Sequence, residues 1–319
     1  MTFDHPERRP ADGPVGGLPA GLRARAAAKV NLALLVGPRR ADGYHELVTV
    51  FQSVALWDEL EVDAVPEATL ELAVEGAPLP ANEGNLVLMA ARELNRWMAA
   101  RRDPRRPAIG ARFRLRKGIP IAAGLGGGSA DGAAALLALD RLWGLGLPLG
   151  DLSAIAAELG SDVPFCLTGG TALATGRGER LRPIAEAGSW SWVLGIARTG
   201  LPTPAVYRRY DELGLGRRLT PSAADGVLGA LADGDPARLA AELVNDLEAA
   251  AFHLRPELAR AKQRMLDGGA LGAVLSGSGP TMLGLAADEA HARRVARAVR
   301  DAFDHVTVVR SPVPGVTFD

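Results

Sequence analysis

Four glycines stand within six residues, directly ahead of a segment rich in alanine and leucine. Because glycine has no Cβ, its backbone N–H groups can approach a polyphosphate closely, and a following helix presents its positive end to the same anion. Residues 133–139 contain no helix breaker, and no turn type needs four glycines. The run therefore predicts a nucleotide-phosphate cradle that leads into a helix over residues 130–143. It consists of Gly124, Leu125, Gly126, Gly127, Gly128 and Ser129.

The better-known phosphate loops do not fit this run. The Walker pattern requires a lysine after the glycines, and none follows. The dinucleotide-binding fingerprint requires glycine or alanine where Ser129 stands, and the HRD and DFG motifs of protein kinases are absent. Ser129, at the expected helix start, would cap the helix or offer its hydroxyl to a phosphate or to Mg²⁺. A flexible loop that only turns the chain remains the alternative.

Composition narrows the class of protein. The 319 residues are enough for two domains, and the net charge of −1 argues against an electrostatic approach to nucleic acid. Cys166 is the only cysteine, which excludes an intramolecular disulfide and a cysteine-rich metal site. No stretch approaches the ~20 apolar residues of a membrane span, and the N-terminus lacks the apolar core of a secretory signal. We therefore expect a cytoplasmic protein that uses neither a membrane nor nucleic acid.

Hydrophobic patterning predicts an α+β protein of two domains. Residues 1–20 are rich in proline and glycine and are expected to form a disordered tail. The N-terminal domain, which contains the nucleotide-phosphate cradle, is expected over residues 21–184, and the C-terminal domain over residues 185–319. Apolar runs and alternation predict strands at residues 30–36, 49–56, 70–74, 111–116, 191–197, 272–276, 282–286 and 305–310. Helical periodicity and caps predict helices at residues 85–98, 130–143, 151–159, 236–252, 256–266 and 289–303.

Two charged residues suggest chemistry beside the cradle. Lys29, one of only three lysines, lies at the head of a buried strand, where it is unfavourable unless paired. Asp162 lies in a constrained turn that leads into an apolar segment. Such a pair suits phosphoryl transfer to a hydroxyl, because the carboxylate can accept the proton while the ammonium keeps the carboxylate ionised. Each residue alone also has a structural explanation, as a snorkelling lysine and a turn-forming aspartate.

An aromatic residue and a histidine follow a turn in the sequence Asp42-Gly43-Tyr44-His45. They form either a loop tip or a reader of a nucleobase, with an aromatic face and an imidazole. The residues themselves leave both interpretations open.

Three ordered motifs resemble the GHMP kinases, the galactokinase–homoserine kinase–mevalonate kinase superfamily. They are Ala-Lys-Val-Asn-Leu at residues 28–32, the segment from Pro120 to Asp131 around the glycines, and Leu-Ser-Gly-Ser-Gly-Pro-Thr at residues 275–281. The likeness covers residues 24–310. It implies a ribosomal-S5-like N-terminal domain and a ferredoxin-like C-terminal domain, with the active site in the cleft between them and ATP with Mg²⁺ as cofactors.

Further segments resemble the members of this superfamily that act on a substrate bearing a cytidine diphosphate. The segments are residues 40–47, 160–164 and 202–204. This likeness implies ATP-dependent phosphorylation of the 2-hydroxyl of 4-diphosphocytidyl-2-C-methyl-D-erythritol, in the non-mevalonate isoprenoid precursor pathway. The alternatives are a sibling kinase of homoserine, mevalonate or a sugar, and a nucleotide-binding regulator without catalysis. The protein is expected to be a monomer or a homodimer.

The same resemblance implies a role for each matching residue. Asp162 corresponds to the base and Lys29 to its partner. Pro120 and residues 124–129 correspond to the triphosphate site, Asn85 to the adenine site, and no metal ligand is implied apart from the candidate Ser129. Tyr44, His45 and Tyr207 match the cytosine site, while Asn31 and Thr203 match substrate contacts. The chain departs from the family at Lys117-Gly118, where Lys-Arg is usual, at Tyr207, where Phe is common, and in its N-terminal tail.

Overall fold

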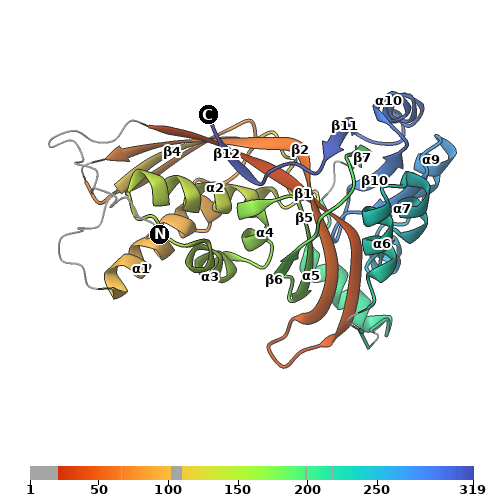
Figure 1. Ribbon diagram of the computed structural model, residues 1–319, viewed down its shortest axis with the longest axis horizontal. Coiled ribbons are helices and arrows are strands. Elements are labelled where there is room, and N and C mark those ends of the chain that lie inside the picture. Colours follow the sequence, from red (N-terminus) through yellow and green to blue (C-terminus); the bar gives the residue numbers. More distant parts are fainter. Residues whose placement is uncertain (1–20, 66, 102–109, 198–199, 217, 221) are drawn as a thin grey trace, which may run out of the picture.

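The computed structural model describes residues 21–65, 67–101, 110–197, 200–216, 218–220 and 222–319, so the tail expected at residues 1–20 lies outside the described residues. The described chain forms two largely antiparallel sheets with helices packed against them (Figure 1). This arrangement confirms the α+β class that the patterning predicts.

The larger sheet is built around a long hairpin of β1 (Leu22–Arg39) and β2 (His45–Val65). Its strands lie in the order β12-β1-β2-β4-β3, while β5 pairs with β2 and β6, and β8 pairs with β1. The other strands of this sheet are β3 (Leu70–Glu75), β4 (Gly110–Arg116), β5 (Thr171–Gly176), β6 (Arg180–Pro183), β8 (Val244–Asn245) and β12 (Val316–Phe318).

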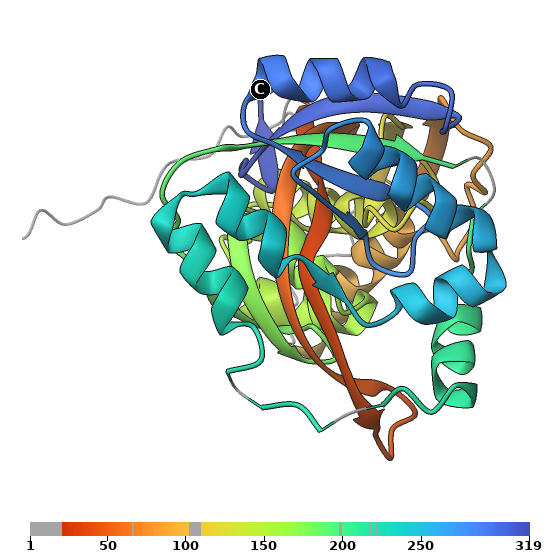
Figure 2. The same cartoon turned by 90° about the vertical axis from the view of Figure 1, so that its right-hand side faces the viewer.

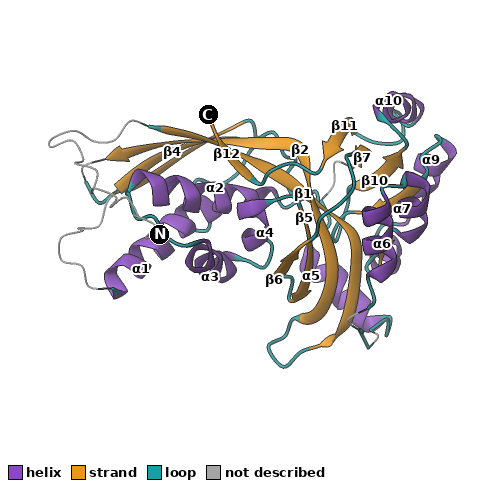
Figure 3. Cartoon of the chain, viewed as in Figure 1, coloured by secondary structure: helices purple, strands orange, loops and turns teal. Residues whose placement is uncertain are grey.

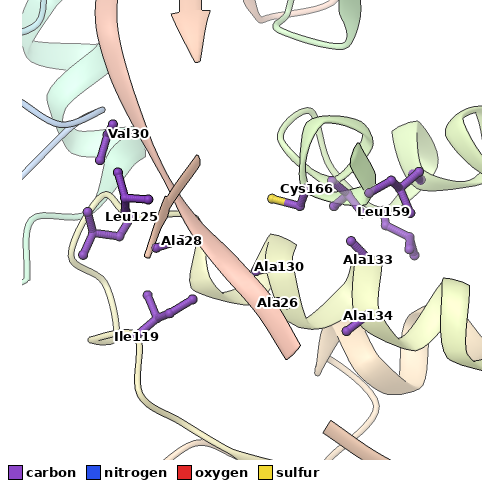
Figure 4. Close-up of a cluster of buried hydrophobic side chains, with 14 of the residues drawn as sticks. Ala26, Ala28, Val30, Ile119, Leu125, Ala130, Ala133, Ala134, Leu159 and Cys166 are labelled. Atoms are coloured by element: carbon purple, nitrogen blue, oxygen red, sulfur yellow. The ribbon is translucent and has the colours of Figure 1, made fainter. Parts of the chain in front are cut away.

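Both strands of the hairpin run well beyond the residues predicted for them. The alanines ahead of Lys29 favour a strand little by themselves, which is why the sequence does not predict one there. In the fold, Ala26 and Ala28 share a buried cluster with Ala130, Ala133 and Ala134 of the helix beneath (Figure 4). Small side chains on both elements let helix and sheet approach closely, so tertiary packing selects the strand.

Four helices gather on one face of the larger sheet (Figure 1). The central one, α2, is buried along most of its length, which its alanine-rich composition allows. It begins at Gly127, three residues before the predicted start, so two glycines of the run lie inside its first turn. The four helices are α1 (Leu86–Ala100), α2 (Gly127–Leu142), α3 (Leu149–Leu159) and α4 (Val163–Thr168).

The second sheet is antiparallel throughout, in the order β11-β7-β10-β9. Its strands are β7 (Trp190–Ile196), β9 (Gly272–Leu275), β10 (Met282–Ala286) and β11 (His305–Ser311). Helices α9 (Pro256–Asp267) and α10 (Glu289–Ala298) pack against it, as Figure 2 shows. Figure 3 shows this sheet at the opposite end of the molecule from α1. The remaining helices are α5 (Thr203–Glu212), α6 (Asp225–Asp233), α7 (Pro236–Glu242) and α8 (Glu248–Leu254).

The helix predicted over residues 236–252 is wrong. It is divided into α7 and α8 by the two-residue strand β8, in which Val244 and Asn245 pair in parallel with Ala33 and Leu34 of β1. The Asn245 side chain donates to the carbonyls of Leu275 and Gly277 at 2.7 Å each, which fixes the break.

Strands β8 and β12 come from the second half of the chain and both pair with β1. The larger sheet therefore draws on both ends of the described sequence. The division at residue 185 stays a prediction.

Candidate active site

A cavity of about 890 Å³ lies where the glycine run meets the hairpin, α4 and α5. It is lined by nearly all the site residues that the sequence predicts, although these come from widely separated segments of the chain. Those that line it are Lys29, Asn31, Tyr44, His45, Pro120, Gly124, Leu125, Gly126, Gly127, Gly128, Ser129, Asp162, Thr203 and Tyr207.

The glycine run is held in a conformation that other residues would resist. Gly124 and Gly126 have φ values of 76° and 68°, in the left-handed region. A Cβ on Gly126 would lie 2.7 Å from Cγ of Lys29, and one on Gly124 would lie 2.3 Å from the Ser276 carbonyl oxygen. Gly127 and Gly128 then supply backbone N–H groups at the N-terminal end of the 16-residue helix α2. This is the backbone arrangement that a phosphate cradle requires.

Ser129 is not the helix cap. The N-cap position belongs to Gly126, which makes no side-chain cap hydrogen bond, because the helix starts earlier than predicted. Ser129 lies in the first turn and lines the cavity, so its hydroxyl stays a candidate for a phosphate or a metal ion. The Leu125 side chain is buried in the core near Val30 (Figure 4), so only its backbone is available to a ligand.

A loop from the second half of the chain lies against the cradle. The Ser276 hydroxyl donates to the Gly124 carbonyl at 2.9 Å, and Ser278 exchanges a hydrogen bond with Thr203 at 2.8 Å. Gly277 and Ser278 also line the cavity. The third motif, residues 275–281, thus belongs to the same site as the first two.

Lys29 and Asp162 form an ion pair inside the cavity. The distance from Lys29 Nζ to Asp162 Oδ2 is 3.1 Å, and the lysine is 5% exposed. Asp162 precedes the short helix α4 but makes no cap hydrogen bond with its side chain. Its carboxylate, with a third of the side chain exposed, is therefore accessible from the cavity.

Lys29 is oriented by a chain of hydrogen bonds. Its Nζ donates to Asn31 Oδ1 at 3.0 Å, and Asn31 Nδ2 donates to Thr49 Oγ1 at 2.8 Å. The Thr49 hydroxyl in turn donates to the Ala33 carbonyl at 2.6 Å. Nζ also lies 5.0 Å from the centre of the Phe51 ring. These contacts compensate for burying the ammonium and leave it beside the carboxylate.

Tyr44 and His45 lie at the tip of the β1–β2 hairpin, as a loop tip requires. Both residues also line the cavity, so the interpretation as a reader of a nucleobase stays a prediction. Tyr44 is 53% exposed, whereas His45 is buried. The His45 and Tyr207 rings lie 5.1 Å apart, and burial raises the pKa of the Tyr207 hydroxyl. His45 Nε2 lies 2.7 Å from Asp211 Oδ1 on α5.

A buried charge cluster that the sequence does not predict lies beneath the cradle. Lys117 Nζ donates to Asp131 Oδ2 at 2.6 Å and to Asp58, whose Oδ1 accepts from the backbone N–H groups of Gly118 and Ile119. Burial raises the pKa of Asp131, and the neighbouring Lys117 opposes this shift. The carboxylates lie 59 and 14 residues from Lys117 in the sequence, so no local pattern joins the three charges, although Lys117 stands out as a scarce lysine and as a departure from the family.

Asn85 does not line the cavity. Its side chain caps α1, accepting from the Val87 N–H at 3.0 Å and donating to the Pro80 carbonyl at 3.2 Å. The neighbouring Leu86 and Leu79 do line it.

Comparison with known proteins identifies the family. The profile of the GHMP kinases N-terminal domain matches residues 85–170, and that of the GHMP kinases C-terminal domain matches residues 227–305. A 4-diphosphocytidyl-2-C-methyl-D-erythritol kinase of Nocardioides sp. is 47% identical over 296 residues, covering 91% of this chain and 97% of the relative. This chain belongs to the 4-diphosphocytidyl-2-C-methyl-D-erythritol kinases of the GHMP family. A Nocardia farcinica member is 46% identical, covering 93% of this chain and 96% of its own.

Solved structures agree with this membership. A crystal structure of a 4-(cytidine 5'-diphospho)-2C-methyl-D-erythritol kinase matches with a TM-score of 0.73 at 38% identity, covering 92% of this chain and 99% of that one. A homoserine kinase from Cytophaga hutchinsonii has the same TM-score at 19% identity, covering 97% of this chain and all of that one. The second likeness shows the shared fold alone.

Two features are absent from the described residues. No helix there is long and apolar enough to cross a membrane. Likewise, no group of three or more His, Cys, Asp or Glu side chains in the described segments could hold a metal ion.

Proposed function

We propose that the protein transfers the γ-phosphoryl group of ATP to the 2-hydroxyl of 4-diphosphocytidyl-2-C-methyl-D-erythritol, a step of the non-mevalonate route to isoprenoid precursors. The observation that carries the proposal is the Lys29–Asp162 ion pair in the same cavity as the glycine-rich start of α2. A regulator that only binds nucleotide has no need of a base there. Family members named for this substrate are 46–47% identical, whereas the homoserine kinase is 19% identical.

Asp162 is the proposed general base. Its carboxylate accepts the proton of the 2-hydroxyl as that oxygen attacks the γ-phosphorus, and the bond to the bridging oxygen of the departing ADP breaks. Lys29 lies 3.1 Å from this carboxylate and offsets negative charge on the transferred group. Asn31, which holds Lys29 from one side, is the proposed neighbour of the substrate at the reacting end.

The triphosphate is assigned to Pro120 and to the backbone of residues 124–129, where any Cβ on Gly124 or Gly126 would collide. Adenine is assigned to Asn85 on the family likeness alone. Ser129, whose hydroxyl lies in the first turn of α2 and lines the cavity, would offer one protein ligand to Mg²⁺. When bound, Mg²⁺ would offset the negative charge of the phosphates.

The cytosine is assigned to the tip of the hairpin and α5. Tyr44 and Tyr207 offer aromatic faces for stacking, and His45 offers a ring nitrogen to the base edge. Thr203, at the start of α5, is assigned to the substrate as well. We also propose a cytoplasmic setting, with which the buried free thiol of Cys166 is compatible. Monomer or homodimer stays a prediction.

A coupled assay of ADP release tests the proposal. The purified protein, with ATP and Mg²⁺, should turn over 4-diphosphocytidyl-2-C-methyl-D-erythritol and leave homoserine, mevalonate and simple sugars unphosphorylated. Turnover of one of those alcohols, without turnover of the cytidine substrate, would overturn the assignment.

Replacement of the proposed general base, Asp162, separates catalysis from ATP binding. Asp162→Asn should lower kcat by roughly 100-fold or more, because the amide cannot accept the proton. ATP binding, measured by calorimetry, should be largely kept. Unchanged turnover in this variant would show that the base is another residue.

A further inference from the structure

The ring of His45 is held on three sides. Tyr207 packs against it with centroids 5.1 Å apart, and Tyr210 meets it edge-on at 6.2 Å and 88°. The Tyr210 hydroxyl lies 2.9 Å from the carbonyls of Val36 and Leu215, so this second ring is itself anchored. The third contact is polar: Asp211 Oδ1 lies 2.7 Å from Nε2. Asp211 follows Tyr210 on α5 and lines the same cavity.

The contact with Asp211 decides which nitrogen of the His45 ring carries the hydrogen. An ionised carboxylate only accepts hydrogen bonds, so Nε2 must be the donor in this pair. A neutral imidazole has one donor and one acceptor, which leaves Nδ1 as the acceptor. Among the described residues, Nδ1 has no hydrogen-bond partner, although His45 lines the cavity.

We propose that Asp211 is a positioning residue that fixes the tautomer of His45, so that Nδ1 accepts a hydrogen bond from an exocyclic amino group of the substrate base. This inference rests on the proposed function and gives a reason why the substrate carries cytosine as its nucleobase. Cytosine carries an amino donor at position 4, where uracil carries a carbonyl acceptor. Against an Nδ1 acceptor, the uracil carbonyl would meet a second acceptor and both would lose their hydrogen bonds. The site therefore selects cytidine over uridine nucleotides.

Substitution of the carboxylate tests this choice. The amide of Asp211→Asn can accept from Nε2 or donate to it, so both tautomers of His45 become available while the side chain keeps its shape. We expect the ratio of kcat/KM for the cytidine substrate to that for its uridine counterpart to fall about tenfold or more. The fall should come mainly from a higher KM for the cytidine substrate, because the base lies away from the reacting hydroxyl.

A matched control lies one residue further on the same helix. Glu212 pairs with Arg209 at 2.7 Å and does not line the cavity. Glu212→Gln removes a carboxylate from α5 and should leave the cytidine-to-uridine ratio unchanged. An unchanged ratio in Asp211→Asn, or equal losses of kcat on both substrates, would overturn the inference.

The tautomer can be observed directly. Proton–nitrogen NMR spectra of the ¹⁵N-histidine protein should show His45 neutral and protonated at Nε2, with the signals assigned by their loss in His45→Gln. Asp211→Asn should shift this population toward the other tautomer. Protonation at Nδ1 in the unaltered protein would overturn the inference. If the unaltered protein fails to phosphorylate the cytidine substrate at all, the proposed function fails instead.

Discussion

At the scale of single residues, the cradle depends on the absence of a side chain at Gly126. Its φ of 68° lies in the left-handed region, which strains any other residue. An added Cβ would also lie only 2.7 Å from Lys29 Cγ. Lys29 cannot move aside without losing its ion pair with Asp162 and its hydrogen bond to Asn31. The glycine therefore protects the position of the proposed catalytic ion pair as well as the path of the phosphate loop.

Gly126→Ala should lower kcat/KM by about tenfold or more, through backbone strain and displacement of Lys29. Steady-state kinetics with ATP and the cytidine substrate provides the measurement. Gly132→Ala, on the same helix, is the matched control, because Gly132 does not line the cavity and its Cβ would meet only Leu86 and Val163 at an ordinary 3.4–3.8 Å. Equal effects of the two substitutions would contradict this account.

At the scale of elements, the sequence predicts α2 and the glycine run because their signals are local and consecutive. It also places Lys29 and Asp162 in one site through chemistry and family likeness. It does not predict β8, because two residues give no periodicity and the strand exists only through pairing with β1. It likewise misses the cluster of Lys117, Asp58 and Asp131, since these charges meet only after β4 and α2 pack together.

Lys117→Met should destabilise the fold by about 3–5 kcal/mol, because it leaves two buried carboxylates without their cation. Urea unfolding measures the loss. The lysine also lines the cavity beside Gly127, so the KM for ATP should rise. Arg112→Met removes a cation from an exposed pair with Glu71 on neighbouring strands and should barely change the unfolding midpoint. A similar midpoint for both variants would contradict the assignment of the cluster as a buried support.

At the scale of the whole molecule, Glu186 ties the two sheets together. It accepts hydrogen bonds from Gln52 on β2 and Trp190 on β7 at 2.8 and 2.6 Å, and from Thr171 on β5. Burial raises the pKa of its carboxyl, and the three hydrogen bonds oppose the shift. A raised pKa in the fold means that the folded chain holds this proton more tightly than the unfolded chain does.

Protonated Glu186 should therefore contribute most to the free energy of unfolding at pH values below the ordinary carboxyl pKa. This contribution should decline as the pH rises through the raised pKa of the folded protein. The amide in a Glu186→Gln variant cannot titrate. The unfolding free energy of the unaltered protein minus that of the variant should fall with rising pH in this mildly acidic range. Urea titrations of both proteins at several pH values measure it, and a difference that rises with pH would contradict the sign.

The contact between the glycine run and the loop of residues 275–281 has a consequence for the order of assembly. The cradle from one half of the chain takes its shape only when Ser276 from the other half reaches the Gly124 carbonyl. Nucleotide affinity should thus appear late in refolding, after both halves have docked. A chain cut between them would regain turnover only when the pieces recombine, so that enzyme activity would serve as a reporter of fragment complementation.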